Sequence, residues 1–97
     1  EDNFIRQANY KQFMAYKQLT KLIREKIQRK ETIETKVLNL YEASNPSFYY
    51  VYEILGDYYA AIQQTDTAIT YWQKALTMPI PKQAEKVRIQ QKINKKQ

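Results

Sequence analysis

The sequence predicts an all-α fold, a short array of about five helices packed as antiparallel hairpins. The 97-residue chain contains one Gly and three Pro, a composition that favours long helices over a turn-rich β fold. Apolar residues recur at gaps of three or four along most of the chain, which is the helical period. Because the segments between these periodic runs are short, neighbouring helices are expected to be antiparallel. The length predicts a single domain, 1–97.

The first helix is expected over residues 3–29, which contain no helix breaker. A second helix is expected over 33–43, after a turn with an N-cap at Glu31–Thr32. It should stop before Pro46, because a residue that precedes Pro disfavours the α conformation. The apolar positions of the first helix are Phe4, Ile5, Ala8, Met14, Ala15, Leu19, Leu22, Ile23 and Ile27.

Three further helices are expected in the rest of the chain. The third should begin at Pro46 or Ser47 and end near Gln63. The fourth should begin at an N-cap cluster over 65–67 and end near residue 77, ahead of two prolines. The fifth, 82–96, is thinly apolar.

Residues 49–80 carry a spaced pattern of aromatic and small residues. An aromatic residue is followed by Leu-Gly and a second aromatic residue, and later by an alanine, a tryptophan and a second alanine, ahead of a proline. This pattern resembles one tetratricopeptide repeat (TPR), a helix–turn–helix unit of ~34 residues. The matching positions are Tyr52, Leu55, Gly56, Tyr59, Ala68, Trp72 and Ala75.

The resemblance implies how two of the helices pack. The small residues Gly56, Ala68 and Ala75 would let the third and fourth helices approach closely, and the aromatic residues would fill the spaces between them. The family commonly has a Gly at the turn between these helices, where this chain has Gln63-Gln64. Residues 15–48 would be a degenerate repeat, 49–80 a well-matched repeat, and 82–97 a capping helix.

The resemblance also implies a concave groove for a partner, lined by the first helix of each repeat. Tyr50, Glu53, Asp57 and Ala61 would face this groove. Some members of the family bind a C-terminal carboxylate there, but two acids would repel it. A basic or Tyr-contacting segment is therefore expected. Alternatively, the two acids are solvated on an exposed face, which we favour over a shared cation or proton.

The residue inventory favours a non-catalytic chain without cofactor or metal. Neither Cys nor His occurs, and no phosphate-binding loop or metal-ligand spacing is present. Ser44 and Ser47 are expected to cap helices. Some of Tyr49, Tyr50 and Tyr58 are expected to be half-exposed.

Charge leaves further alternatives open. Residues 1–30 and 82–97 are basic, whereas 31–81 are acidic. The basic ends could bind nucleic acid or an anionic surface, although solubilising charge that complements the acidic middle is favoured. No apolar run reaches the ~18 residues that a membrane span needs. The sequence is consistent with both a cytoplasmic and an exported location.

The function expected is a protein-interaction or scaffolding module of the TPR type, whose partner is a protein or peptide segment. The chain also resembles the C-terminal repeat tail of bacterial proteins related to aminopenicillanate acyltransferase, and it would then be a structural tail of a larger chain. Because it begins at Glu1 and not at Met, we expect a processed or trimmed chain. Self-association through an exposed helix face is a further expectation.

Overall fold

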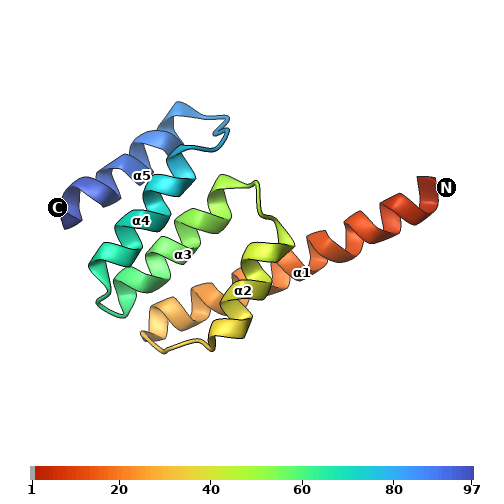
Figure 1. Cartoon of the computed structure of the whole chain (residues 1–97), viewed down its shortest axis with the longest axis horizontal. Helices are drawn as coiled ribbons and strands as arrows, with labels where there is room; N and C mark the ends of the chain where they lie inside the picture. The colour runs from red at the N-terminus through yellow and green to blue at the C-terminus, as the bar shows by residue number, and fades with distance from the viewer. Residues whose placement is uncertain (1) are drawn as a thin grey trace.

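The computed structural model describes residues 2–97, with side chains described from residue 10 onward, and this part of the chain is all-helical as predicted. It measures 49 × 30 × 17 Å along its principal axes. Consecutive helices pack against one another, and α3 and α4 run side by side in opposite directions (Figure 1). The helices are α1 (Asp2–Arg29), α2 (Thr35–Ser44), α3 (Tyr49–Ala61), α4 (Thr65–Leu76) and α5 (Gln83–Lys96).

The helix α3 lies at the centre of the core. Six consecutive residues, 51–56, are all buried, which requires neighbours on every side of the helix. These neighbours are α4, α1 and α2. Among the described residues, the other helices contribute one to three buried residues each, such as Ile23 from α1, Tyr41 from α2 and Ile89 from α5. The predicted apolar positions Phe4, Ile5 and Ala8 lie outside the described side chains.

Two helices end in the same turn, in which a non-glycine residue takes a left-handed conformation. Lys30 follows α1 with φ 56° and Gln63 follows α3 with φ 67°. After each, the next backbone N–H bonds a carbonyl five residues back, Glu31 to Lys26 at 3.0 Å and Gln64 to Tyr59 at 2.8 Å. This is the Schellman pattern, which usually places Gly at the left-handed position. Gln63 thus adopts the conformation that a glycine would take in this turn.

The predicted starts of three helices were wrong. The Glu31–Thr32 segment does not cap α2, whose N-cap is Glu34, because the Ile33 N–H donates to the Tyr58 hydroxyl at 2.9 Å and holds this segment outside the helix. α3 begins at Tyr49.

Residues 45–48 form a turn closed by the Phe48 N–H on the Asn45 carbonyl at 3.3 Å. Pro46 occupies the second position of this turn, which suits its fixed φ. α4 begins at Thr65 after an N-cap at Gln64, without a side-chain cap. The Schellman turn leads directly into this helix, and the 65–67 cluster lies inside it.

Gly56 lies directly beneath the indole of Trp72. A Cβ built on Gly56 would lie 2.4 Å from both Cδ1 and Nε1 of Trp72, well inside van der Waals contact. The close approach of α4 therefore places an aromatic ring, rather than backbone, on the bare Cα. Ala68 and Ala75 of α4 are both fully buried.

The helix α1 extends past the rest of the fold at its N-terminal end (Figure 1). On this projecting part, Tyr10 and Phe13 are 63% and 53% exposed. The nearer half of α1 packs on α2 and α3. There Tyr16 stacks on Tyr41 with ring centroids 5.9 Å apart, and the Thr20 hydroxyl lies 2.8 Å from that of Tyr41.

We predict that Gly56→Ala destabilises the protein although Ala is the better helix former. The added methyl group would overlap the Trp72 ring, at a cost of about 1–3 kcal/mol, whereas the gain in helix propensity is about 1 kcal/mol. Urea denaturation of the two proteins measures the net loss. In a Trp72→Leu background the same substitution should lose its penalty, and an equal penalty in that background would contradict the assigned contact.

Candidate functional site

A buried carboxylate on α3 is held by two cations from α5. Glu53 is 1% exposed, and its Oε1 accepts from Arg88 Nη2 at 2.6 Å. Its Oε2 accepts from Arg88 Nε and from Lys92 Nζ, both at 2.7 Å. The guanidinium therefore binds the carboxylate through two parallel N–H groups, the strongest geometry available to such a pair.

Asp57, one helical turn further along α3, completes the cluster. Lys92 Nζ donates to its Oδ1 at 2.9 Å and to its Oδ2 at 3.0 Å. The Trp72 indole N–H lies 3.1 Å from Asp57 Oδ1 and 3.2 Å from the Glu53 carbonyl oxygen. The cluster thus joins α3, α4 and α5 through one lysine, one arginine and one indole. We call Glu53, Asp57, Arg88 and Lys92 the ion-pair cluster.

The expectation that Glu53 and Asp57 are solvated acids was wrong. Glu53 is buried and Asp57 is half-buried, and the side chains of Arg88 and Lys92 reach from α5 to this face of α3 and supply the opposite charges. A buried carboxylate without partners would cost several kcal/mol, so the two cations are required by the burial itself.

The environment of the ion-pair cluster shifts the pKa values of its two acids in opposite directions. Burial alone raises the pKa of Glu53, but the hydrogen bonds from Arg88 and Lys92 outweigh burial and leave that pKa below its usual value. For Asp57, burial is the larger effect and the pKa ends above its usual value, although Lys92 lowers it. The pKa of Arg88 is raised, chiefly by its hydrogen bond to Glu53.

A hollow of about 370 Å³ lies beside the ion-pair cluster, and we call it the central hollow. Three of the four predicted groove residues, Tyr50, Glu53 and Asp57, line it, whereas Ala61 does not. The walls come from three helices that are far apart in sequence. The remaining lining residues are Arg24, Ile27 and Gln28 of α1, Ile54 of α3, and Arg88 and Lys92 of α5.

A second hollow of about 490 Å³ follows α1, and we call it the α1 hollow. It shares Arg24 and Gln28 with the central hollow, so the two adjoin. The Arg24 guanidinium donates to the Tyr50 hydroxyl at 3.2 Å and thereby connects α1 to α3 at this boundary. The residues that only the α1 hollow contains are Tyr16, Lys17, Thr20, Lys21 and Glu25.

The tyrosines of α3 differ in how deeply they are buried. Tyr50 is half-buried, which agrees with the expectation that some of the three rings are half-exposed, whereas Tyr49 and Tyr58 are only 4% and 2% exposed. The Tyr58 hydroxyl accepts the Ile33 N–H. The pKa of Tyr49 is raised to about 12, first by burial and then by its neighbour Glu85.

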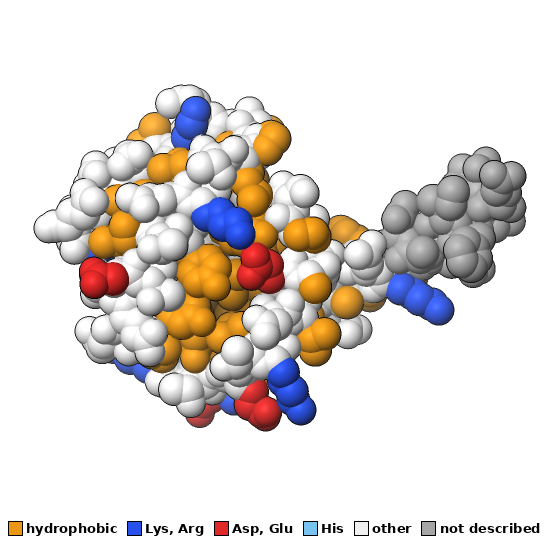
Figure 2. Space-filling view, viewed as in Figure 1, with side chains coloured by type: hydrophobic (Ala, Val, Ile, Leu, Met, Phe, Trp, Pro, Cys, Tyr) orange, Lys and Arg blue, Asp and Glu red, His pale blue; other side chains and the backbone are white. Residues whose placement is uncertain are grey.

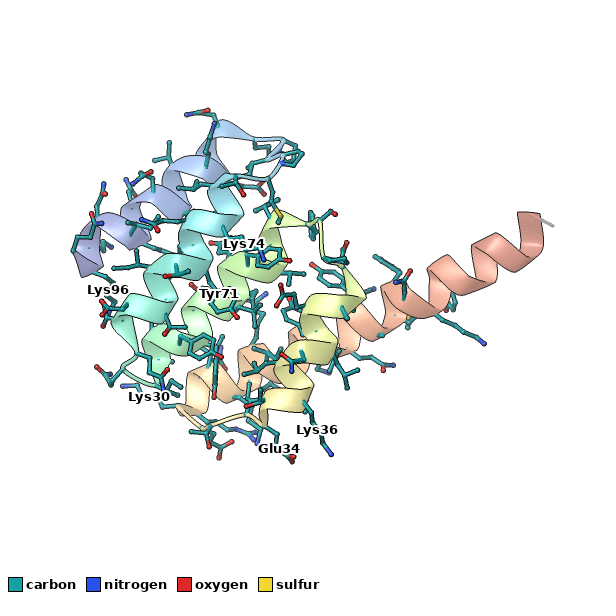
Figure 3. All side chains as sticks on the ribbon, in the orientation of Figure 1. Lys30, Glu34, Lys36, Tyr71, Lys74 and Lys96 are labelled. Carbon is teal, nitrogen blue, oxygen red and sulfur yellow. The ribbon has the colours of Figure 1, made fainter. Side chains whose placement is uncertain are left out.

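A different face of the molecule, between α2 and α4, carries stacked tyrosines. The ring of Tyr71 lies 5.4 Å from that of Tyr59 and 6.4 Å from that of Tyr52, nearly parallel to both. Tyr71 and Lys74 extend from α4 toward α2 (Figure 3), and Lys74 pairs with Glu42 of α2 at 3.3 Å. Hydrophobic side chains gather in the middle of this face between the two helices (Figure 2).

The seven positions that carry the repeat pattern all belong to the core or pack against it. Tyr59 is half-buried and packs against the core. The other six, Tyr52, Leu55, Gly56, Ala68, Trp72 and Ala75, are buried.

Sequence reasoning missed the cationic half of the site, which consists of Arg24, Arg88 and Lys92. A signal was present in the spacing of charges. Two acids four residues apart on α3 face two cations four residues apart on α5, so that each acid pairs with the cation 35 residues later. This separation is one residue longer than the ~34-residue tetratricopeptide unit that the sequence pattern resembles.

Comparisons of the chain with family models, with curated proteins and with solved structures found no match. Among the described residues, no group of three or more His, Cys, Asp or Glu side chains is arranged to hold a metal ion. In that same part of the chain, no helix combines the length and apolar character that crossing a membrane requires.

We predict that Glu53→Gln destabilises the protein by about 3 kcal/mol at pH 7, because it removes one partner of a buried charged network. Urea unfolding monitored by Trp72 fluorescence measures this loss. Glu34→Gln is the matched control, since the Glu34 side chain is 76% exposed and its loss should cost little. Equal effects of the two substitutions would contradict a structural role for the ion-pair cluster.

The difference in the free energy of unfolding between wild type and Glu53→Gln should become smaller as the pH falls. A folded-state pKa below the unfolded value stabilises the fold above the unfolded pKa, and this contribution disappears as the pH falls through the folded pKa. Asp57, whose pKa is raised, is present in both proteins, so its own contribution largely cancels from this difference. Repeating the unfolding measurement from pH 7 down to about 3 tests this dependence. A difference in unfolding free energy that stays constant over this pH range would contradict the prediction.

Proposed function

We propose that this chain is a non-catalytic protein-interaction or scaffolding module of the TPR type, which binds an extended segment of a partner protein. The observation that carries the proposal is the central hollow, to which α1, α3 and α5 all contribute side chains. These are the first, third and fifth helices, the set that would line the groove of a repeat array. The spacing of the seven repeat-pattern residues and the contact of Trp72 with Gly56 support the same proposal.

The hollow is suited to a peptide because its walls are preformed. The ion-pair cluster fixes α5 against α3, and the hydrogen bond of Arg24 to Tyr50 connects α1 to the same helix. A partner segment therefore meets a surface whose side chains are already ordered, which lowers the entropic cost of binding. Ile27 and Ile54 offer apolar contact, while Gln28 and Arg24 offer hydrogen-bond donors.

A selection from a random peptide library tests this function, because it assumes nothing about the ligand. We predict that selected peptides perturb backbone amides of α1, α3 and α5 in NMR titrations. Gln28→Trp, which fills the central hollow, should weaken them about tenfold. Gln73→Trp, an exposed position on α4, is the matched control and should leave binding unchanged. Failure to select any peptide, or perturbations confined to α2 and α4, would overturn the proposal.

A second candidate function is a structural tail that braces another domain of a larger bacterial protein, of the acyltransferase-related kind. The exposed Tyr10 and Phe13 on the projecting part of α1 favour it, since a large apolar side chain exposed on a helix offers a contact for a neighbour.

We predict on this account that the isolated chain self-associates through the uncovered end of α1. Sedimentation velocity over a range of concentrations should detect the association, and Tyr10→Ser with Phe13→Ser should abolish it. Exposed Leu40 on α2 provides the control, Leu40→Ser. A chain that stays monomeric, or one that Leu40→Ser dissociates equally, would contradict this candidate.

A further inference from the structure

The ion-pair cluster changes the charge that the central hollow presents to a ligand. Glu53 and Asp57 lie in its wall, but every carboxylate oxygen of the two accepts from Arg88, Lys92 or Trp72. The acids are therefore neutralised within the wall. The expectation that they would repel a ligand carboxylate and select a basic segment loses its physical reason.

Two cations of the wall, Arg88 and Arg24, by contrast, keep donors to spare. A guanidinium has five N–H groups, and Arg88 uses two of them on Glu53. Arg24 is exposed and uses one on the Tyr50 hydroxyl. Because Arg24 belongs to both hollows, its remaining donors lie at their common boundary.

The positive character continues along α1. Lys17 and Lys21 are exposed and line the α1 hollow. The two hollows together are lined by five cations and three carboxylates. Two of the cations and two of the carboxylates belong to the ion-pair cluster. The unneutralised charge is therefore concentrated along one path, from Lys17 through Lys21 to Arg24.

We propose that the two hollows together bind an extended acidic segment of a partner protein, with its carboxylates along the path from Lys17 to Arg24. This inference rests on the proposed interaction function and names the chemical class of its partner. Tyr16, Ile27 and Ile54 would contact apolar side chains between the acids. The recognised segment would thus mix acidic with apolar or aromatic residues.

A peptide fits this surface better than a nucleic acid does. DNA carries one negative charge per ~1.7 Å of duplex, and such a continuous row of phosphates would pass the third carboxylate of the wall, Glu25. A peptide can place its separated carboxylates opposite separate cations. Three exposed cations, Lys17, Lys21 and Arg24, line the α1 side of this surface. Three positive charges suit a ligand that carries a few carboxylates better than they suit a polyanion.

Fluorescence anisotropy with labelled peptides of about ten residues, long enough to cross both hollows when extended, tests the inference on the whole chain. The probe alternates Glu with Leu, and two matched probes replace Glu by Gln or by Lys. We expect the Glu peptide to bind about tenfold more tightly than the Gln peptide. Its affinity should fall as salt rises from about 0.05 to about 0.3 M.

Charge reversal at the boundary of the hollows supplies the decisive variant. Arg24→Glu should weaken the Glu peptide about tenfold or more, and Arg24→Gln by less. Lys36→Glu makes the same change of net charge on α2, where the Lys36 side chain is 78% exposed and outside both hollows, and it should have little effect. Circular dichroism and urea unfolding establish that each variant is folded.

Three results would overturn the inference. The Lys or Gln peptide could bind as tightly as the Glu peptide. Lys36→Glu could weaken binding as much as Arg24→Glu. An oligothymidylate of similar length could bind more tightly than the Glu peptide and displace it, which would assign the surface to nucleic acid. If library selection instead yields basic or neutral peptides bound in the central hollow, the interaction function stands and the acidic partner is wrong.

Discussion

The structure depends on one buried carboxylate, Glu53, and on the two cations that α5 brings to it. Isolated in the core, this charge would destabilise the fold by several kcal/mol. Arg88 and Lys92 satisfy both of its oxygens, and they do so only when α5 lies across α3. α5 has few apolar residues of its own, with Ile89 and Ile93 buried. Its position is therefore specified both by packing on α4 and by these ion pairs to α3, whereas the contact of α3 with α4 includes the close packing at Gly56.

The same interaction shapes the candidate binding surface. With α5 in place, Arg88 and Lys92 form one wall of the central hollow, and the acids of α3 no longer act as free negative charges toward a ligand. Arg24, Lys17 and Lys21 then dominate the exposed charge of the two hollows. An acidic pair that suggests a site for cations in the sequence becomes, through its ion pairs, part of a surface suited to anions.

The sequence was sufficient for the helices and for the contact of α3 with α4, because both depend on local information. Periodicity located all five helices, and the repeat spacing predicted a close approach of the third and fourth helices at Gly56, although the Trp72 ring and not the backbone of α4 lies there. The starts of α2, α3 and α4 were misplaced because each depends on a turn: the left-handed Lys30 and Gln63, and the turn around Pro46. The environment of Glu53 was missed because its partners are 35 and 39 residues away, a distance over which the helical period of three to four residues carries no information.

A double-mutant cycle between Glu53 and Arg88 tests the central claim most directly. The free energy of unfolding is measured for wild type, Glu53→Gln, Arg88→Met and the double variant. The account predicts a coupling energy of about 2 kcal/mol, because Arg88→Met leaves the buried Glu53 carboxylate without its bidentate partner, whereas in Glu53→Gln that charge is already absent. A coupling energy within about 0.3 kcal/mol of zero would mean that the two side chains act independently. The fold would then not depend on this ion pair.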